Sequence, residues 1–179
     1  MSNRGRLMSE MSLEAFQTQV FPVRNKLYRF ALKMLQHEED AKDVVQEVLV
    51  RVWNKRGELD QVKSLEAWCM TITRNLSLDK LKSKHRKSGP FPEGFEVMEE
   101  RKSPLENLEL NDTMRRINEF ILKLPEKQKQ IIQLRDIEGF SYNEISEILD
   151  IDINQVKVNL FRARKAIKEN LLNLNAYGL

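Results

Sequence analysis

Apolar residues recur every three or four positions along most of this chain, which is the spacing of one buried face of an α-helix. Three such runs lie in the first half, at residues 13–35, 38–56 and 65–84. Pro22 interrupts the first run and predicts a kink or break there. Gly57 follows the second run, and Ser64 precedes the third as an N-cap. With six glycines and few alternating Val, Ile or Thr positions, the sequence predicts an all-α fold.

The second half ends in a helix-turn-helix pattern within residues 124–171. Ser141 and Glu144 have the spacing of a capping box ahead of a short amphipathic helix. A turn at residues 150–152 follows, and Asp152 can cap a longer helix. That helix keeps small or branched apolar residues on its inward face, namely Val156, Leu160, Ala163 and Ile167. Two helices joined in this way place the second in the DNA major groove.

The outward positions of the last helix carry amides and bases. Asn and Gln side chains can bond adenine, and Arg and Lys can bond guanine or phosphate. The acids of this segment stay mostly in the shorter helix and the turn. We therefore expect a DNA-facing surface made of Asn154, Gln155, Lys157, Val158, Asn159, Arg162, Arg164 and Lys165. An ordinary helical hairpin with a solvated polar face is the alternative.

Residues 84–104 break the helical pattern, with three prolines and two glycines among polar residues. We predict two small helical domains joined by a flexible linker, the C-terminal domain containing the helix-turn-helix. The predicted parts are a disordered N-terminus at 1–12, a first domain at 13–86, the linker at 87–104 and a second domain at 105–175.

Composition narrows the chemistry. Charged residues make up 32% of the 179 residues, and the net charge is only +3, so any nucleic-acid surface must be a local patch. The single Cys69 excludes a disulfide framework and a cysteine-based zinc site, and His37 and His85 are isolated, so we expect no metal or cofactor. No apolar run is long enough for a membrane span, and the N-terminus lacks a signal-peptide core. A reduced, cytoplasmic compartment fits.

Two charged surfaces occur in the first half. Helical spacing places the acidic residues of the second run on one face, together with a glutamine: Asp40, Asp43, Gln46 and Glu47. The third run ends in a basic stretch that also contains Asn75 and Asp79: Arg74, Asn75, Asp79, Lys80, Lys82, Lys84 and Arg86. The simpler alternatives are a solvated acidic face and a lysine-rich helix end, which the helix dipole also favours.

Together these residues resemble a bacterial RNA polymerase sigma factor of the extracytoplasmic-function (ECF) class. Three motifs in this order carry the resemblance: DAKDVVQEVLVRVW (40–53), LEAWCMTITRNLSLDKL (65–81) and LPEKQKQIIQLRDIEGFSYNEISEILDIDINQVKVNLFRARKAI (124–167). The resemblance covers nearly the whole chain outside the extreme N-terminus and the linker.

The resemblance assigns a role to each surface. Residues 40, 43, 46 and 47 match positions that dock on the clamp helices of the polymerase β′ subunit. Asn75 and Asp79 match positions that read exposed bases of the −10 promoter element. The neighbouring cations are expected to contact the backbone of that strand. The helix-turn-helix matches the part that reads the −35 element. The implied partners are core RNA polymerase, including its β subunit, and promoter DNA. An anti-sigma factor is a further partner that the family allows.

Some positions depart from the family pattern or invite another interpretation. Asp150 and Asp152 replace residues such as Gly and Pro in the turn, and their charge is expected to weaken DNA affinity. Trp53 and Trp68 are expected to pack in the core rather than to stack on bases, and Cys69 to be a packed small residue.

Two other functions compete with a sigma factor. One is a stand-alone helix-turn-helix repressor or activator whose first half serves for dimerisation or ligand binding, although such a protein needs neither the acidic nor the basic helix. The other is an enzyme, for which the sequence offers no nucleophile and base pair, phosphate loop or metal cluster.

Overall fold

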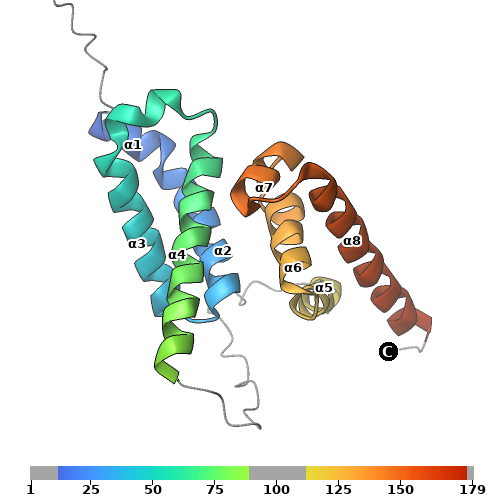
Figure 1. The fold of residues 1–179 in the computed structure, drawn as a ribbon. Coiled ribbons are helices and arrows are strands. Elements are labelled where there is room, and N and C mark those ends of the chain that lie inside the picture. Colours follow the sequence, from blue (N-terminus) through green and yellow to red (C-terminus); the bar gives the residue numbers. More distant parts are fainter. Residues whose placement is uncertain (1–11, 89–111, 177–179) are drawn as a thin grey trace, which may run out of the picture. The chain divides into compact units, whose positions relative to one another are not determined.

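The computed structural model describes residues 12–88 and 112–176, and every regular element in those two ranges is a helix (Figure 1). The chain divides into two compact units, Met1–Ser83 and Lys84–Leu179. The all-α fold with two small helical domains is therefore confirmed. The predicted disordered N-terminus, apart from Ser12, and residues 89–104 of the predicted linker lie outside the described residues.

The first unit contains α1 (Leu13–Gln19), the 3-10 turn η1 (Phe21–Val23), α2 (Arg24–Leu35), α3 (Glu38–Asn54), the 3-10 helix η2 (Arg56–Gln61) and all but the last turn of α4 (Leu65–Ser88). Pro22 lies in η1 and divides the first apolar run, as predicted. α3 ends before Gly57, with Lys55 as its C-cap. α4 is longer than its apolar pattern, so residues 87 and 88 of the predicted linker are helical.

The core of the first unit shows that the buried face of α4 is not made of apolar residues alone. Leu27 and Phe30 of α2 and Val48 of α3 are buried. On α4, Thr73 and Ser77 are fully buried, and their hydroxyls donate to backbone carbonyls one turn earlier, at 2.9 Å and 2.8 Å. Buried hydroxyls bonded in this way are tolerated, but a count of apolar residues does not detect the face that they occupy.

The second unit contains α5 (Asp112–Leu122), α6 (Glu126–Ile132), the π-helical turn η4 (Gln133–Ile137), α7 (Tyr142–Leu149) and α8 (Ile153–Ala176). Its core joins Ile131 and Leu134 to Ile145 and Ile148 of α7 and Leu160 of α8, all of which are buried. The predicted capping box is present, because Ser141 accepts from the Glu144 amide and the Glu144 side chain accepts from the Ser141 amide.

The turn between α7 and α8 uses its two aspartates differently. Asp150 ends α7 in the left-handed conformation, with φ of 52°. Asp152 then caps α8, since its Oδ1 accepts a 2.7 Å hydrogen bond from the Asn154 amide. The left-handed residue and the cap together set where α7 ends and α8 begins.

Candidate nucleic-acid interface

The first turns of α8 present an exposed face. Asn154, Gln155, Lys157 and Val158 are exposed, and so are Arg162 and Lys165 further along. Val156, Leu160 and Ala163 on the opposite side are buried. The structure therefore brings these six predicted DNA-facing residues to the outside of one helix.

Two predicted members of this surface have other contacts. Asn159 is half-buried, and its amide donates 2.8 Å to the Gln155 carbonyl oxygen of its own helix. Arg164 Nε donates 3.0 Å to Asp136 of η4, and a second guanidinium nitrogen contacts the other carboxylate oxygen. The Arg164 side chain, about half exposed, thus lies on the flank of α8 beside η4, and its expected contact with DNA stays a prediction.

Phe161 was not among the expected residues, and it is the most exposed large apolar side chain of the described part of the chain, at 69%. It lies three residues after Val158, which is 46% exposed, and four before Lys165, so the three share a face. Exposing a large aromatic ring to water is unfavourable, so an exposed ring of this kind marks a surface that contacts another molecule. The sequence signal for Phe161 is its place on the outward side of the helix, three residues after Val158.

The exposed face of α4 carries the second predicted surface. Asn75 and Asp79, one turn apart, are both exposed, as are Lys82 and Lys84. Arg74 is half-buried, and its Nη1 donates 3.4 Å to the Asn75 amide oxygen. This contact uses the Asn75 amide oxygen. The side chain of Arg86 lies outside the described residues.

Lys80 does not belong to that face. It follows Thr73 and Ser77 at steps of four and three, on the inward stripe of α4. Its Nζ lies 3.1 Å from Asp40 Oδ1 and 3.0 Å from Asp43 Oδ2, both on α3. Burial lowers the pKa of Lys80, but the hydrogen bonds to Asp43 and Asp40 outweigh it, and the pKa is raised. Lys80 thus links α3 to α4, and its expected contact with the −10 element stays a prediction.

The acidic surface of α3 is partly exposed. Asp43, Gln46 and Glu47 are exposed, and Glu47 pairs with Arg51 one turn later at 2.6 Å. The Asp40 side chain is only 18% exposed and faces Lys80 and His37. Val50, 58% exposed, lies one turn after Gln46 and Glu47 at the end of this face and was not expected. The outer face of α3 therefore combines acidic, amide and apolar contacts.

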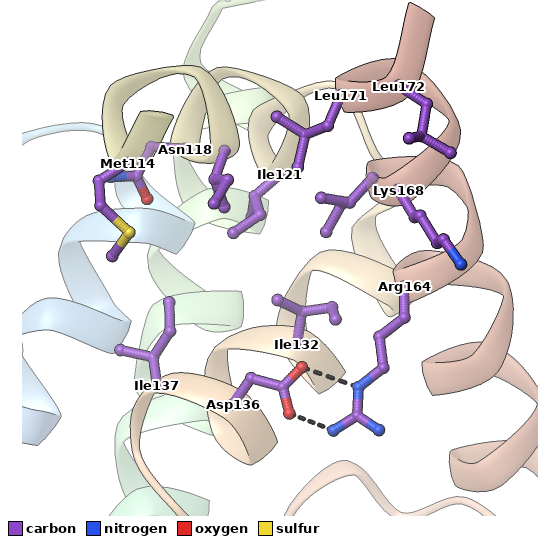
Figure 2. A pocket seen from close by; sticks show the side chains of 12 residues that line it. Met114, Asn118, Ile121, Ile132, Asp136, Ile137, Arg164, Lys168, Leu171 and Leu172 are labelled. Atoms are coloured by element: carbon purple, nitrogen blue, oxygen red, sulfur yellow. Dashed lines mark hydrogen bonds and ion pairs between the residues drawn. The ribbon is translucent and has the colours of Figure 1, made fainter. Parts of the chain in front are cut away.

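The second unit holds an apolar groove of about 530 Å³ between α5, η4 and the C-terminal half of α8. Figure 2 shows Met114, Ile121 and Ile132 on one side and Leu171 and Leu172 on the other. The Asp136–Arg164 pair closes one end, and Lys168 lies at the rim. Met114 and Leu172 are about half exposed, at 49% and 54%, so the groove is open to solvent.

The aromatic and sulfur positions take structural roles. The Trp53 ring packs edge-on against Phe16 at 5.2 Å, with the Arg56 guanidinium 4.4 Å from its centre. Trp68 is half-buried. Cys69 is fully buried, and burial raises the pKa of its thiol to about 12. The thiol is therefore protonated at neutral pH, as expected for a packed residue.

Within residues 12–88 and 112–176, no group of three or more His, Cys, Asp or Glu side chains is placed to hold a metal ion. The same ranges contain no helix that is both long enough and apolar enough to cross a membrane.

Known proteins resemble both units. A model of Sigma-70 region 2 matches residues 22–87, and a model of Sigma-70 region 4 matches residues 114–167. The ECF RNA polymerase sigma factor SigW of Bacillus subtilis (strain 168) is 29% identical over 182 residues, covering 90% of this chain and 91% of that protein. The ECF RNA polymerase sigma-E factor of Escherichia coli (strain K12) is 31% identical over 138 residues, covering 72% of each.

The chain belongs to the ECF RNA polymerase sigma factors. A solved sigma factor, RpoE of Bartonella quintana in complex with the anti-sigma factor NepR, superposes with a TM-score of 0.68 at 26% identity, covering 89% of this chain and 98% of that chain. CnrH, solved with the cytosolic domain of CnrY, shares the fold, with a TM-score of 0.63 at 22% identity and 89% of each chain covered.

As an ECF sigma factor, the protein recognises promoters with core RNA polymerase during transcription initiation, and it is not an enzyme. The region 2 match contains the α3 and α4 surfaces, and the region 4 match contains the helix-turn-helix. A stand-alone repressor would have no use for a region 2 domain, so that alternative is wrong.

Proposed function

We propose that this sigma factor divides its work among three helix faces. The outer face of α8 reads the −35 element, the outer face of α4 reads the −10 element, and the outer face of α3 docks on the β′ subunit of core polymerase. The observation that carries the proposal is the exposure of the polar residues on each face, while the opposite face of the same helix is buried.

At the −35 element, base reading belongs to the first turns of α8. Asn154 and Gln155 offer amides that match adenine, and Val158 with Phe161 offers an apolar surface for thymine methyl groups. Lys157, Arg162 and Lys165 provide phosphate contacts. Arg164 and Asn159 support the helix instead, because their side chains already bond Asp136 and the α8 backbone.

At the −10 element, Asn75 and Asp79 read unpaired bases. The Asp79 carboxylate only accepts hydrogen bonds, so it prefers a base amino group such as that of cytosine. The Asn75 amide both donates and accepts, and its contact with Arg74 orients it. Lys82, Lys84 and Arg86 follow along α4 as cations for the strand backbone, since single strands bind through stacking, edge contacts and charge together.

On α3, Asp43, Gln46 and Glu47 form the polymerase-docking face, with Val50 as its apolar contact. Acidic residues around an apolar centre suit a basic partner helix. Asp40 contributes from the edge, since it is mostly covered by Lys80 and His37.

The groove of the second unit is a further docking surface, and we assign it to an apolar segment of the polymerase β subunit. Its open apolar lining needs a protein partner to be shielded from water. An anti-sigma factor is expected to compete for the docking faces, because the similar RpoE and CnrH structures were solved as complexes of that kind or with a cytosolic partner domain. With polymerase and DNA as partners, the protein acts in the cytoplasm.

Charge reversal tests the docking assignment. Asp43→Lys with Glu47→Lys should weaken binding to core polymerase by at least tenfold, because truncating a desolvated charge pair at an interface costs on the order of 2 kcal/mol or more. The matched control is Glu14→Lys with Glu119→Lys, which makes the same charge change at exposed positions outside α3. Equal affinity of the two double variants in a fluorescence titration would refute docking through α3.

A further inference from the structure

We propose that Lys80 is a built-in counter-ion that competes with the polymerase for Asp43 and thereby sets the affinity of this sigma factor for core polymerase. The inference rests on the proposed docking role of Asp43. Lys80 comes from α4 and Asp43 from α3, 37 positions apart in the sequence, and their charged atoms lie 3.0 Å apart.

Lys80 lies at the contact between α3 and α4 and is only partly exposed. It continues the stripe of Thr73 and Ser77, which are fully buried, and its own side chain is 30% exposed. Asp40, 18% exposed, anchors the same ammonium at 3.1 Å. Two carboxylates of α3 thus hold the ammonium beside Asp43 in the free protein, where it offsets part of the Asp43 charge.

Asp43 itself is accessible to a partner. Its side chain is 65% exposed, and Lys80 occupies only one of its carboxylate oxygens, Oδ2. A cation of the polymerase can therefore approach the other oxygen, but it then meets the positive charge of Lys80 across one carboxylate. Two like charges at such a site repel each other, so docking either displaces Lys80 or binds less tightly.

Glu47 has no comparable competitor from another helix in the described structure around it. Glu47 pairs with Arg51, on the same helix one turn away, and both side chains are about half exposed, at 49% and 52%. A pair of this type is weak and rearranges easily. The control of affinity that we infer is therefore specific to the Asp43 position.

The test is a double-mutant cycle on core polymerase binding with Lys80→Gln, Asp43→Asn and the two combined. Lys80→Gln should tighten binding about two- to fivefold, the range of a partly exposed ion pair. In the Asp43→Asn background the same change should have no effect, because the carboxylate for which Lys80 and the polymerase compete is gone. Lys80→Arg should keep the wild-type affinity.

A second inter-helix pair supplies the matched control. Lys26 of α2 bonds Glu66 of α4 at 2.5 Å, with both side chains about one-third exposed and neither on α3. Lys26→Gln removes the same charge and a similar pair, and should leave core affinity unchanged. If Lys80→Gln does not unfold cooperatively, Lys80→Met, which keeps the aliphatic stem, takes its place.

The outcomes separate the two claims. Unchanged or weaker binding of Lys80→Gln overturns the counter-ion role. If Lys80→Gln tightens core binding equally with and without Asp43, the role is also overturned, because the loss of the Lys80 charge then acts at long range rather than through Asp43. If Asp43→Asn binds core polymerase as tightly as the wild type, the docking role of Asp43 fails, and the inference fails with it. The inference is supported only by tightening that depends on Asp43.

Discussion

Asp136 and Arg164 form a two-point ion pair that joins η4 to the middle of α8. The hydrogen bonds to Asp136 raise the pKa of Arg164 above its ordinary value, despite the opposing effect of burial. The guanidinium is thereby held at the end of the groove, beside η4. On the proposed assignment, Arg164 supports the domain, while Arg162 contacts DNA.

The two arginines on α8 should behave differently when removed. Arg164→Ala should lower the free energy of unfolding by roughly 0.2 to 1 kcal/mol, as for an exposed pair, and Asp136→Asn should do the same. Arg162→Ala should leave stability nearly unchanged and weaken holoenzyme binding to all promoters alike. It should also lower the slope of log K against log salt by about 0.9, the loss of one phosphate contact. Thermal unfolding and anisotropy over a salt series measure both, and an Arg164→Ala slope as low as that of Arg162→Ala would contradict the division.

Removing a base-reading amide should relax specificity rather than affinity in general. Gln155→Ala should broaden the preference at one or two −35 positions by about 1 to 3 kcal/mol of lost discrimination, because its amide can bond a base edge in two places. Selection from a randomised −35 library by the holoenzyme measures this. A uniform loss at all sequences would instead assign Gln155 to the backbone.

Phe161→Ala should weaken −35 binding although the side chain contributes little to the fold, because 69% of it is exposed in the free protein. The expected loss is greatest for sites with thymine, whose methyl group offers an apolar contact. Leu13→Ala, an exposed leucine at 60% on α1, is the control. Equal promoter binding by both variants would leave Phe161 without a DNA role.

The two left-handed residues predict a pair of stabilising changes. Asp150 and Gln36 have φ of 52° and 50°, a region that glycine adopts without steric cost. Asp150→Gly and Gln36→Gly should each raise the free energy of unfolding by about 0.5 to 1 kcal/mol. Only Asp150→Gly should also tighten −35 binding, because it removes a negative charge beside α8. If Gln36→Gly tightened DNA binding equally, the charge argument would fail.

Burial of Cys69 predicts that its thiol reacts slowly and that the free energy of unfolding falls at high pH. Because its pKa is raised to about 12 from 9.0, the folded state favours the protonated thiol. This contribution is fully present below pH 9 and is lost as the pH rises toward 12. At pH 8, labelling by a thiol reagent should be roughly a thousandfold slower in the native protein than in urea, in line with the thiolate fraction. Rapid native labelling would mean that the thiol is not buried.

The sequence predicted what depends on neighbours along the chain. The capping box of Ser141 and Glu144, the break at Pro22 and the buried stripe of α8 all follow from spacing within one or two turns. The partners of Lys80 and Arg164 did not follow, because they lie 37 to 40 and 28 positions away. A lysine in a basic stretch looks like a DNA contact until the opposite helix is in place.

Spacing along the sequence likewise does not predict some helix faces, as it does not predict these ion pairs. Thr73 and Ser77 are polar by type, so the inward stripe of α4 could not be traced through them to Lys80. The groove between α5, η4 and α8 likewise depends on how three elements meet, which spacing within each element does not specify.

On the proposed assignment, this sigma factor directs core polymerase to a promoter and engages the opened −10 strand through Asn75 and Asp79. Permanganate footprinting of the holoenzyme on a duplex promoter tests it most directly, because the reagent detects unpaired thymines. The wild type should open the −10 region, and Asn75→Ala with Asp79→Ala should not, while −35 binding persists. A template with the −10 bases already mismatched should restore much of the double variant's activity, since it removes an unpairing cost of a few kcal/mol. A bubble of normal extent and stability in the double variant on duplex DNA would contradict the account.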